Sequence, residues 1–292
     1  MGNIVCSLLG GAIGDVLFFF CSGFTLYLGR ERRFDNYYKR RINRIYPTVF
    51  MWAFMASSLF GIHEDMTSVM IQGGGWFVSC IMIYYVVLYF VRKYLFQYLL
   101  AVFVGSLLLS FLWYVLMDRP EGYNMYGFTY FKWCHYFSFM LLGAMLGAKK
   151  FHVVFSPKWD VLKLVASIAA FYAILLMGKR SDSMHDLQIM SLFPLLAITF
   201  YFYKVCNSSF LRKCYQAKGV SPIFKTISGL CLEVYLVQYV LLTDKLNLLF
   251  PFNLLIIFVF ILFVAYILRC LARIFSQTFK DEDYRWKDVF KV

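Results

Sequence analysis

Apolar residues fill long runs along the chain, and short polar stretches separate these runs. A helix needs about 20 apolar residues to cross a bilayer, because each residue advances it by about 1.5 Å. On this basis the pattern predicts nine membrane spans, at about 12–29, 46–62, 74–95, 97–117, 131–148, 160–177, 186–205, 223–243 and 250–275. We therefore expect a polytopic membrane protein.

The runs are apolar on every side, as helical spans are. The stretch NLLIIFVFILFVAYIL, residues 253–268, shows no alternation of polar and apolar positions. Strands of a membrane barrel would alternate, because one face meets lipid and the other the lumen. Since only α-helices and closed barrels satisfy their backbone groups in lipid, the expected fold class is all-α, a bundle of about nine transmembrane helices.

Composition narrows the classes of partner. Only 15% of residues are charged, whereas soluble domains carry roughly 25%. The net charge of +13 comes from basic residues in short loops between spans, so we expect no nucleic-acid partner. The eight cysteines form no CxxC pair and mostly lie within apolar runs, so we expect neither disulfides nor a bound metal.

The basic residues also predict the orientation of the chain. If the loop 30–45 is cytoplasmic, 24 of the 29 lysines and arginines fall on the cytoplasmic side. This number includes six basic residues near the C-terminus, which we count with a cytoplasmic tail expected at 276–292. Nine spans would then place Met1 outside the cell. The opening MGNIVCSLLGG looks like the end of an earlier hairpin, so we expect one further span upstream and ten in the intact protein.

Five stretches carry a family resemblance. In order they read GAIGDVLFFFCSGFTLYL, YYKRRINRIYPTVF, GGGWFVSCIMIYYVVLYF, YFSFMLLGAMLGA and ISGLCLEVYLVQYVLL. Together they resemble the acyltransferase-3 family, integral-membrane enzymes that move acyl groups, usually acetyl, onto cell-surface glycans and related molecules. The second stretch is similar to a basic loop that ends in R-x-x-R, here Arg41 and Arg44, followed by a proline-started span. The resemblance implies a membrane O-acyltransferase.

Two departures from the family pattern concern activity. The resemblance implies a first span with a histidine, preceded by an arginine, that is central to acyl transfer, and no such span lies in this sequence. In the late span, Gln238 stands where the family usually has a histidine. The chain is thus either part of an active enzyme or an inactive remnant.

Arg41 and Arg44 are the expected binding residues for a phosphate-bearing donor. Three positions apart at a helix entry, they project from one face at the cytoplasmic surface, and Arg40 adds to the patch. A guanidinium binds phosphate through two parallel hydrogen bonds. Acetyl-CoA, or another acyl-CoA, is a cytosolic acyl donor that carries several phosphates. The alternative is a charge cluster that only fixes topology or binds anionic lipid headgroups.

His135 and Glu233 are the expected catalytic residues. His135 lies just inside a predicted span, where a neutral imidazole could take a proton from an acceptor hydroxyl, although a solvated or hydrogen-bonded histidine fits equally. Glu233 lies ten residues into its span, roughly 15 Å deep, and needs a partner or a water-filled cavity. It either lines a donor channel or pairs with a basic group on a neighbouring helix. Asp15 is expected to cap a helix start.

The sequence therefore predicts an O-acyltransferase of the plasma (inner) membrane with a cytoplasmic C-terminus. Its expected partners are membrane lipid, acyl-CoA and a glycan or lipid-linked sugar acceptor. The alternatives are a transporter or flippase for a polar or lipid-linked solute, and a non-catalytic truncated remnant. A transporter would usually show internal repeats and paired broken helices, and neither is evident in the sequence.

Overall fold

The structure is a computed structural model that describes residues 11–63, 65, 67–72, 75–118, 123–127, 130–149, 154–180, 182–217, 219–280 and 282–291. Throughout this part of the chain the regular structure is helical, which confirms the all-α prediction. The elements are α2 (Gly11–Leu28), α3 (Phe34–Phe60), η1 (Ser68–Gln72), α4 (Trp76–Tyr94), η2 (Phe96–Tyr98), α5 (Leu99–Leu116), α6 (Lys132–Gly147), α7 (Pro157–Arg180), η3 (Asp182–Ser191), α8 (Leu192–Cys206), α9 (Ser209–Gln216), α10 (Val220–Gly229), α11 (Cys231–Leu241), η4 (Asp244–Leu249), α12 (Phe252–Thr278) and α13 (Trp286–Val289).

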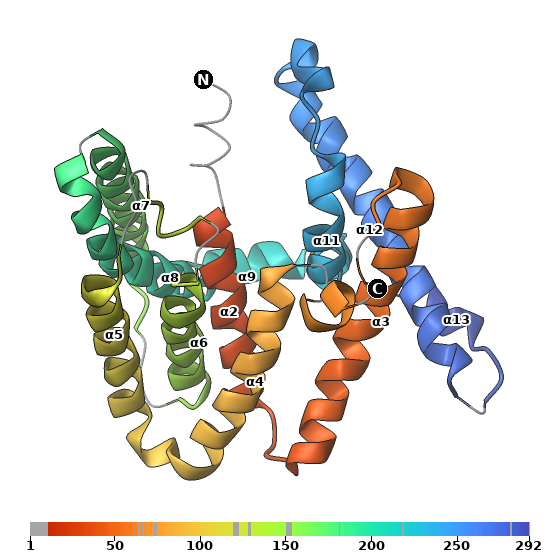
Figure 1. The fold of residues 1–292 in the computed structure, drawn as a ribbon, viewed down its shortest axis with the longest axis horizontal. Helices are drawn as coiled ribbons and strands as arrows, with labels where there is room; N and C mark the ends of the chain where they lie inside the picture. The colour runs from red at the N-terminus through yellow and green to blue at the C-terminus, as the bar shows by residue number, and fades with distance from the viewer. Residues whose placement is uncertain are drawn as a thin grey trace. The chain divides into compact units, whose positions relative to one another are not determined.

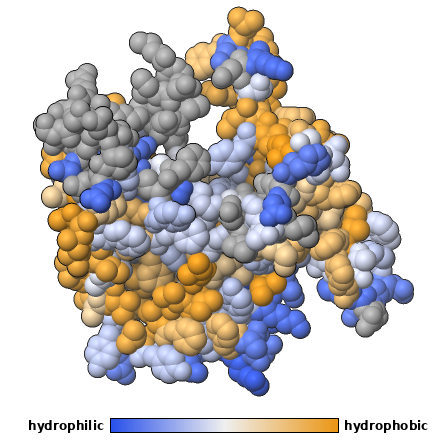
Figure 2. All heavy atoms as spheres, viewed as in Figure 1, coloured by the Kyte–Doolittle hydropathy of each residue, from blue (hydrophilic) through white to orange (hydrophobic). Residues whose placement is uncertain are grey.

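Fewer of the described helices are suited to cross a membrane than the nine spans expected. Six of the described helices are long and apolar enough to cross a membrane, and the bent pair α10–α11 brings the number to seven if it counts as one span. The expected spans at 46–62 and 131–148 also form helices, α3 and α6. However, α3 begins with a basic, polar stretch, and α6 has only 16 residues, about 24 Å of helix against a hydrocarbon core of about 30 Å. Hydrophobic residues nevertheless cover broad areas of the visible surface (Figure 2).

The chain divides into two compact units, which we describe separately. The first comprises Met1–Glu31 and Tyr84–Lys213, and the second comprises Arg32–Ile83 and Cys214–Val292. Helices α4 and α9 therefore contribute residues to both units.

The first unit is built around the pair α2 and α6, which run side by side (Figure 1). Glycines bring the two backbones together. A Cβ atom on Gly23 of α2 would overlap the carbonyl of Met140, and one on Gly143 of α6 would overlap the carbonyl of Phe20. Small residues permit this close approach where helices associate in lipid. Helix α5 packs on α6, and α7 packs on α8 and η3.

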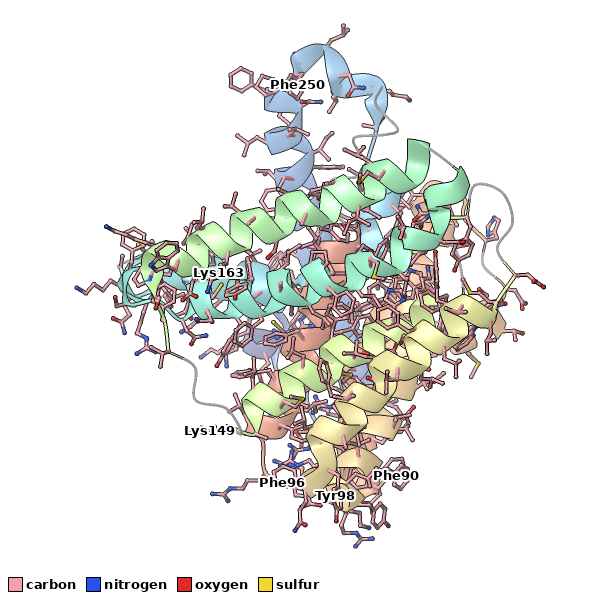
Figure 3. All side chains as sticks on the ribbon, turned by 90° about the vertical axis from the view of Figure 1, so that its left-hand side faces the viewer. Phe90, Phe96, Tyr98, Lys149, Lys163 and Phe250 are labelled. Atoms are coloured by element: carbon pink, nitrogen blue, oxygen red, sulfur yellow. The ribbon has the colours of Figure 1, made fainter. Side chains whose placement is uncertain are left out.

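One end of the first unit carries aromatic and basic side chains together. Phe90, near the end of α4, and Phe96 and Tyr98, in η2 between α4 and α5, lie together at this end (Figure 3), and all three are exposed. At the same end the guanidinium of Arg92 donates hydrogen bonds to the carbonyls of Leu26 and Gly29 and so closes the end of α2. Aromatic belts with flanking basic residues are typical of a membrane–water interface.

The second unit holds α3, α11 and α12, which pack on one another. Helix α3 is continuous from Phe34 to Phe60 and contains Pro47 in its interior. The expectation that a separate span starts at the proline was therefore wrong, because the helix tolerates the lost backbone donor and runs on. As a result the basic run and the apolar run form one rigid helix.

Candidate functional site

A buried carboxylate lies at the centre of the second unit. Glu233, in the first turn of α11, is fully buried, and its Oε1 accepts a hydrogen bond from Arg269 Nη1 of α12 at 2.7 Å. The hydroxyl of Thr48, on α3, donates to the same oxygen at 3.3 Å. Within the described residues, Oε2 of Glu233 has no hydrogen-bond partner. Three helices thus contribute one polar group each to a single contact.

The position of this cluster corrects the expected depth of Glu233. The expectation assumed one straight span at 223–243, but α10 and α11 meet at a bend of 70°, and α11 begins only at Cys231. Helix α12 has no charged residue from Phe252 to Leu268, a stretch of about 25 Å at 1.5 Å per residue. Because the hydrocarbon core is about 30 Å thick, Arg269 and its partner Glu233 lie near one boundary of the core rather than at its centre.

Arg269 and Thr48 are the two members of the cluster that sequence reasoning missed. Arg269 was counted with the basic residues of the C-terminal tail, yet it lies inside α12. The available signal was the carboxylate itself, because a buried charge requires a partner of opposite sign. The pairing agrees with the expected alternative in which Glu233 binds a basic group on a neighbouring helix.

The R-x-x-R pair, Arg41 and Arg44, lies on α3 before Thr48, which belongs to this cluster. Arg44 precedes Thr48 by one helical turn and therefore lies on the same side of α3. It is also close enough to the thiol of Cys231, at the start of α11, to interact with it electrostatically. Arg41 is half-buried, and its guanidinium carbon lies 5.4 Å from the centroid of the Tyr37 ring, whereas Arg40 is exposed. The sequence-predicted residues Arg44 and Glu233 thus both interact electrostatically with Cys231.

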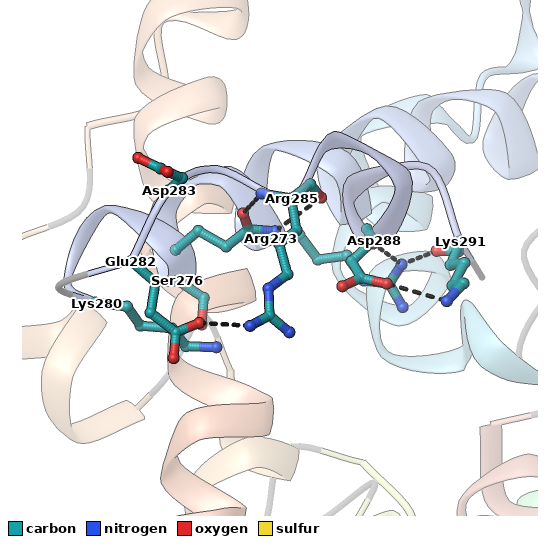
Figure 4. Close-up of a pocket in the computed structure, with 9 residues that line it drawn as sticks. Arg273, Ser276, Lys280, Glu282, Asp283, Arg285, Asp288 and Lys291 are labelled. Atoms are coloured by element: carbon teal, nitrogen blue, oxygen red, sulfur yellow. Dashed lines mark hydrogen bonds and ion pairs between the residues drawn. The ribbon is translucent and has the colours of Figure 1, made fainter.

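The C-terminal segment folds against the last turns of α12. Arg273 donates hydrogen bonds to the carbonyls of Asp288 and Lys291, and the hydroxyl of Tyr266 donates to the carbonyl of Phe290 at 3.1 Å. A pocket of about 350 Å³ lies between this segment and α12 (Figure 4). Its lining carries side chains of both charge signs: Arg273, Lys280, Glu282, Asp283, Arg285, Asp288 and Lys291.

His135 belongs to the first unit and is fully buried there. Its Nδ1 lies 3.2 Å from the carbonyl oxygen of Phe131, and its Nε2 has no hydrogen-bond partner within the described residues. The rings of Tyr126, Phe131 and Tyr136 surround it, with centroids 4.3–5.6 Å away. The ring of His135 is therefore buried and hydrogen-bonded, and its role as a base stays a prediction.

One further acidic residue, Asp15, was expected from the sequence to cap a helix start. Asp15 of α2 accepts a hydrogen bond from the Tyr136 hydroxyl of α6 at 3.4 Å, which links the two helices. In the short loop after α3, His63 Nδ1 lies 2.9 Å from the Ser57 hydroxyl oxygen. Among the residues that the structure describes, no three histidine, cysteine or acidic side chains are close enough to hold a metal ion.

A family model described as an acyltransferase domain, that of the acyltransferase-3 family, matches residues 3–271 of the chain. No curated protein and no solved structure matches it. The family match covers most of the sequence, and it agrees with the helical, lipid-exposed architecture described above. The chain is therefore a multi-pass membrane protein that belongs to the acyltransferase-3 family of acyltransferases.

Proposed function

We propose that the protein is an O-acyltransferase of the plasma (inner) membrane that takes an acyl group, preferably acetyl, from cytosolic acyl-CoA. The acceptor is a hydroxyl of a cell-surface glycan or a lipid-linked sugar. One observation carries the proposal: Arg41 and Arg44 lie on the same helix as Thr48, near the boundary of the membrane core. Thr48 in turn donates a hydrogen bond to the buried Glu233, which binds Arg269. A water-soluble donor can reach such a position without crossing the bilayer.

The two arginines suit the phosphates of coenzyme A. Each planar guanidinium offers paired donors that match phosphate oxygens, and Arg40 adds positive charge at the exposed edge. With the phosphates held at Arg41 and Arg44, the thioester arm extends along α3 toward Thr48 and Glu233. The Oε2 atom of Glu233 is the acceptor available to it.

The transfer itself is a nucleophilic acyl substitution. The acceptor oxygen attacks the thioester carbonyl carbon, the new C–O bond replaces the C–S bond, and coenzyme A leaves as its thiolate. The hydroxyl proton passes to a base and then to the departing sulfur. We propose Glu233 and His135 as the two candidate bases for this step. Oε2 of Glu233 and Nε2 of His135 each have no hydrogen-bond partner within the described residues.

The proposal is tested by replacing the arginine pair. Membranes carrying the full-length protein, incubated with radiolabelled acetyl-CoA and glycan extract, should transfer label to the glycan. We expect Arg41→Ala/Arg44→Ala to raise the KM for acetyl-CoA by roughly 100-fold, because two charge-assisted hydrogen bonds contribute about 3 kcal/mol together. Initial rates over a series of acetyl-CoA concentrations measure this change.

The matched control removes the same charge from the adjacent part of the same basic stretch. Arg32 and Arg33 are exposed and precede α3, so Arg32→Ala/Arg33→Ala should leave the KM nearly unchanged. A protease-accessible C-terminal tag verifies that both variants keep one orientation. An equal change of KM in both variants would show that the arginines act only through the overall positive charge of the basic stretch. Absence of any transferred label would reject the acyltransferase proposal.

The break between α10 and α11 is the one observation that favours a transporter, since transport proteins often bind solutes at broken helices. Transporters usually carry two such breaks in related repeats, and the described residues contain one bent pair. Proteoliposomes loaded with a polar or lipid-linked sugar distinguish the two functions. Solute movement without acyl-CoA, together with no label transfer, would establish the transporter.

A further inference from the structure

Helix α10, Val220–Gly229, makes few contacts with the rest of its unit. None of its residues is buried; it packs on α11, and its Phe224 ring contacts Tyr215 of α9. From its pattern, its exposure and its angle to α11, we infer that α10 lies in the plane of the membrane, embedded among anionic lipid headgroups. On this inference α10 is not the first half of a membrane span. The inference does not depend on which acyl donor the protein uses.

The residues of α10 form an amphipathic pattern. Val220, Ile223, Phe224 and Ile227 are spaced i, i+3, i+4 and i+7, so they share one face of the helix. Ile223 is 60% exposed and Phe224 is 59% exposed. The other positions hold the polar residues Ser221, Lys225, Thr226 and Ser228, together with Pro222 and Gly229. An exposed apolar stripe opposite a basic and polar face is typical of helices that lie in a membrane interface.

The position of α11 sets the depth of α10. Glu233, in the first turn of α11, is bound to Arg269, which lies where the uncharged stretch of α12 ends. The start of α11 is therefore near the boundary of the hydrocarbon core. A helix that meets α11 there at 70° runs across the bilayer normal, within the headgroup layer. A straight continuation would instead have carried Lys225 away from the membrane.

Neighbouring residues identify lipid as the occupant of the apolar face. The ring of Tyr215, at the end of α9, contacts Phe224 with centroids 6.4 Å apart and extends the apolar face by an amphipathic aromatic side chain. Leu230, at the break, is buried and fixes the junction to α11. Lys225 of α10 supplies the positive charge that attracts anionic headgroups.

Photo-cross-linking tests this arrangement in the intact protein. The photoreactive amino acid benzoylphenylalanine replaces either Ile223 or Phe224 in the full-length chain. Each variant is reconstituted in nanodiscs of phosphatidylglycerol and phosphatidylcholine. Thr226→benzoylphenylalanine, on the polar side of the same helix, is the matched control. After irradiation, mass spectrometry identifies the partner of each cross-link. We expect lipid adducts several-fold more abundant at positions 223 and 224 than at 226.

The lipid composition separates the possible outcomes. Replacing phosphatidylglycerol by phosphatidylcholine, or introducing Lys225→Gln, should reduce the yield of lipid adducts at position 224. Adducts to peptides of this chain or of another protein at positions 223 and 224 would overturn the inference, because the face would then be a protein interface. Equal lipid adducts at 223, 224 and 226 would also overturn it, since a helix that crosses the core meets lipid on every exposed side.

Discussion

Replacing Arg269 by alanine will strongly destabilise the protein, because the Glu233 carboxylate is then left charged, fully buried and without its cation. Removal of one partner of a buried ion pair costs about 3–5 kcal/mol in the free energy of unfolding. The 2.7 Å contact and the complete burial of Glu233 place this pair in that class. Thermal unfolding of the purified protein in detergent, followed by circular dichroism, measures the loss.

The two single substitutions should differ. The side chain of Arg269 is 18% exposed, whereas that of Glu233 is fully buried. Glu233→Gln therefore leaves a cation that can reach water, and we expect it to cost less than Arg269→Ala. The double variant Glu233→Leu/Arg269→Met removes both charges and should recover most of the lost stability. A melting temperature for Arg269→Ala equal to that of the native protein would contradict the buried pair.

The same double variant separates a structural role of Glu233 from a catalytic one. If Glu233 only holds the helices together, restored stability should restore acyl transfer as well. We expect instead that Glu233→Leu/Arg269→Met folds but transfers no label, because the oxygen that we propose as a base is gone. Transfer at the native rate would leave His135 as the remaining candidate base.

Replacing Gly23 by alanine will force α2 and α6 apart. The new Cβ atom would overlap the carbonyl oxygen of Met140, which is backbone and cannot move without shifting the whole helix. Overpacking of a core costs about 1–3 kcal/mol, and we expect the upper end, about 3 kcal/mol, because no flexible side chain can give way. A lowered melting temperature in detergent, together with faster hydrogen exchange in α2 and α6, measures the effect.

Gly14 supplies the matched control within the same helix. A Cβ atom at Gly14 meets nothing within 4 Å, so Gly14→Ala makes the same chemical change without a collision. We expect it to be neutral or to stabilise α2 by about 1 kcal/mol, because alanine favours the helix more than glycine does. If Gly14→Ala and Gly23→Ala lower stability equally, the loss reflects the helix itself and not its packing on α6.

The sequence by itself was sufficient for the helical class, the membrane location and the family. These properties are encoded locally: an apolar run must be long enough to cross lipid, and a helix is the structure that satisfies its own backbone there. The stretch YFSFMLLGAMLGA resembles a family motif, but the sequence does not show what its glycines contact. The structure supplies the reason for Gly143, which allows α6 to contact the backbone of α2 at Phe20.

Only the tertiary structure decided which polar groups meet. Arg269 lies 36 positions after Glu233 and Thr48 lies 185 positions before it, and no periodicity in the sequence connects them. The bend at Leu230 was equally hidden, because α10 and α11 are apolar enough together to resemble one straight span. A buried charge in a membrane helix requires a partner, but the packing of neighbouring helices determines which residue that partner is.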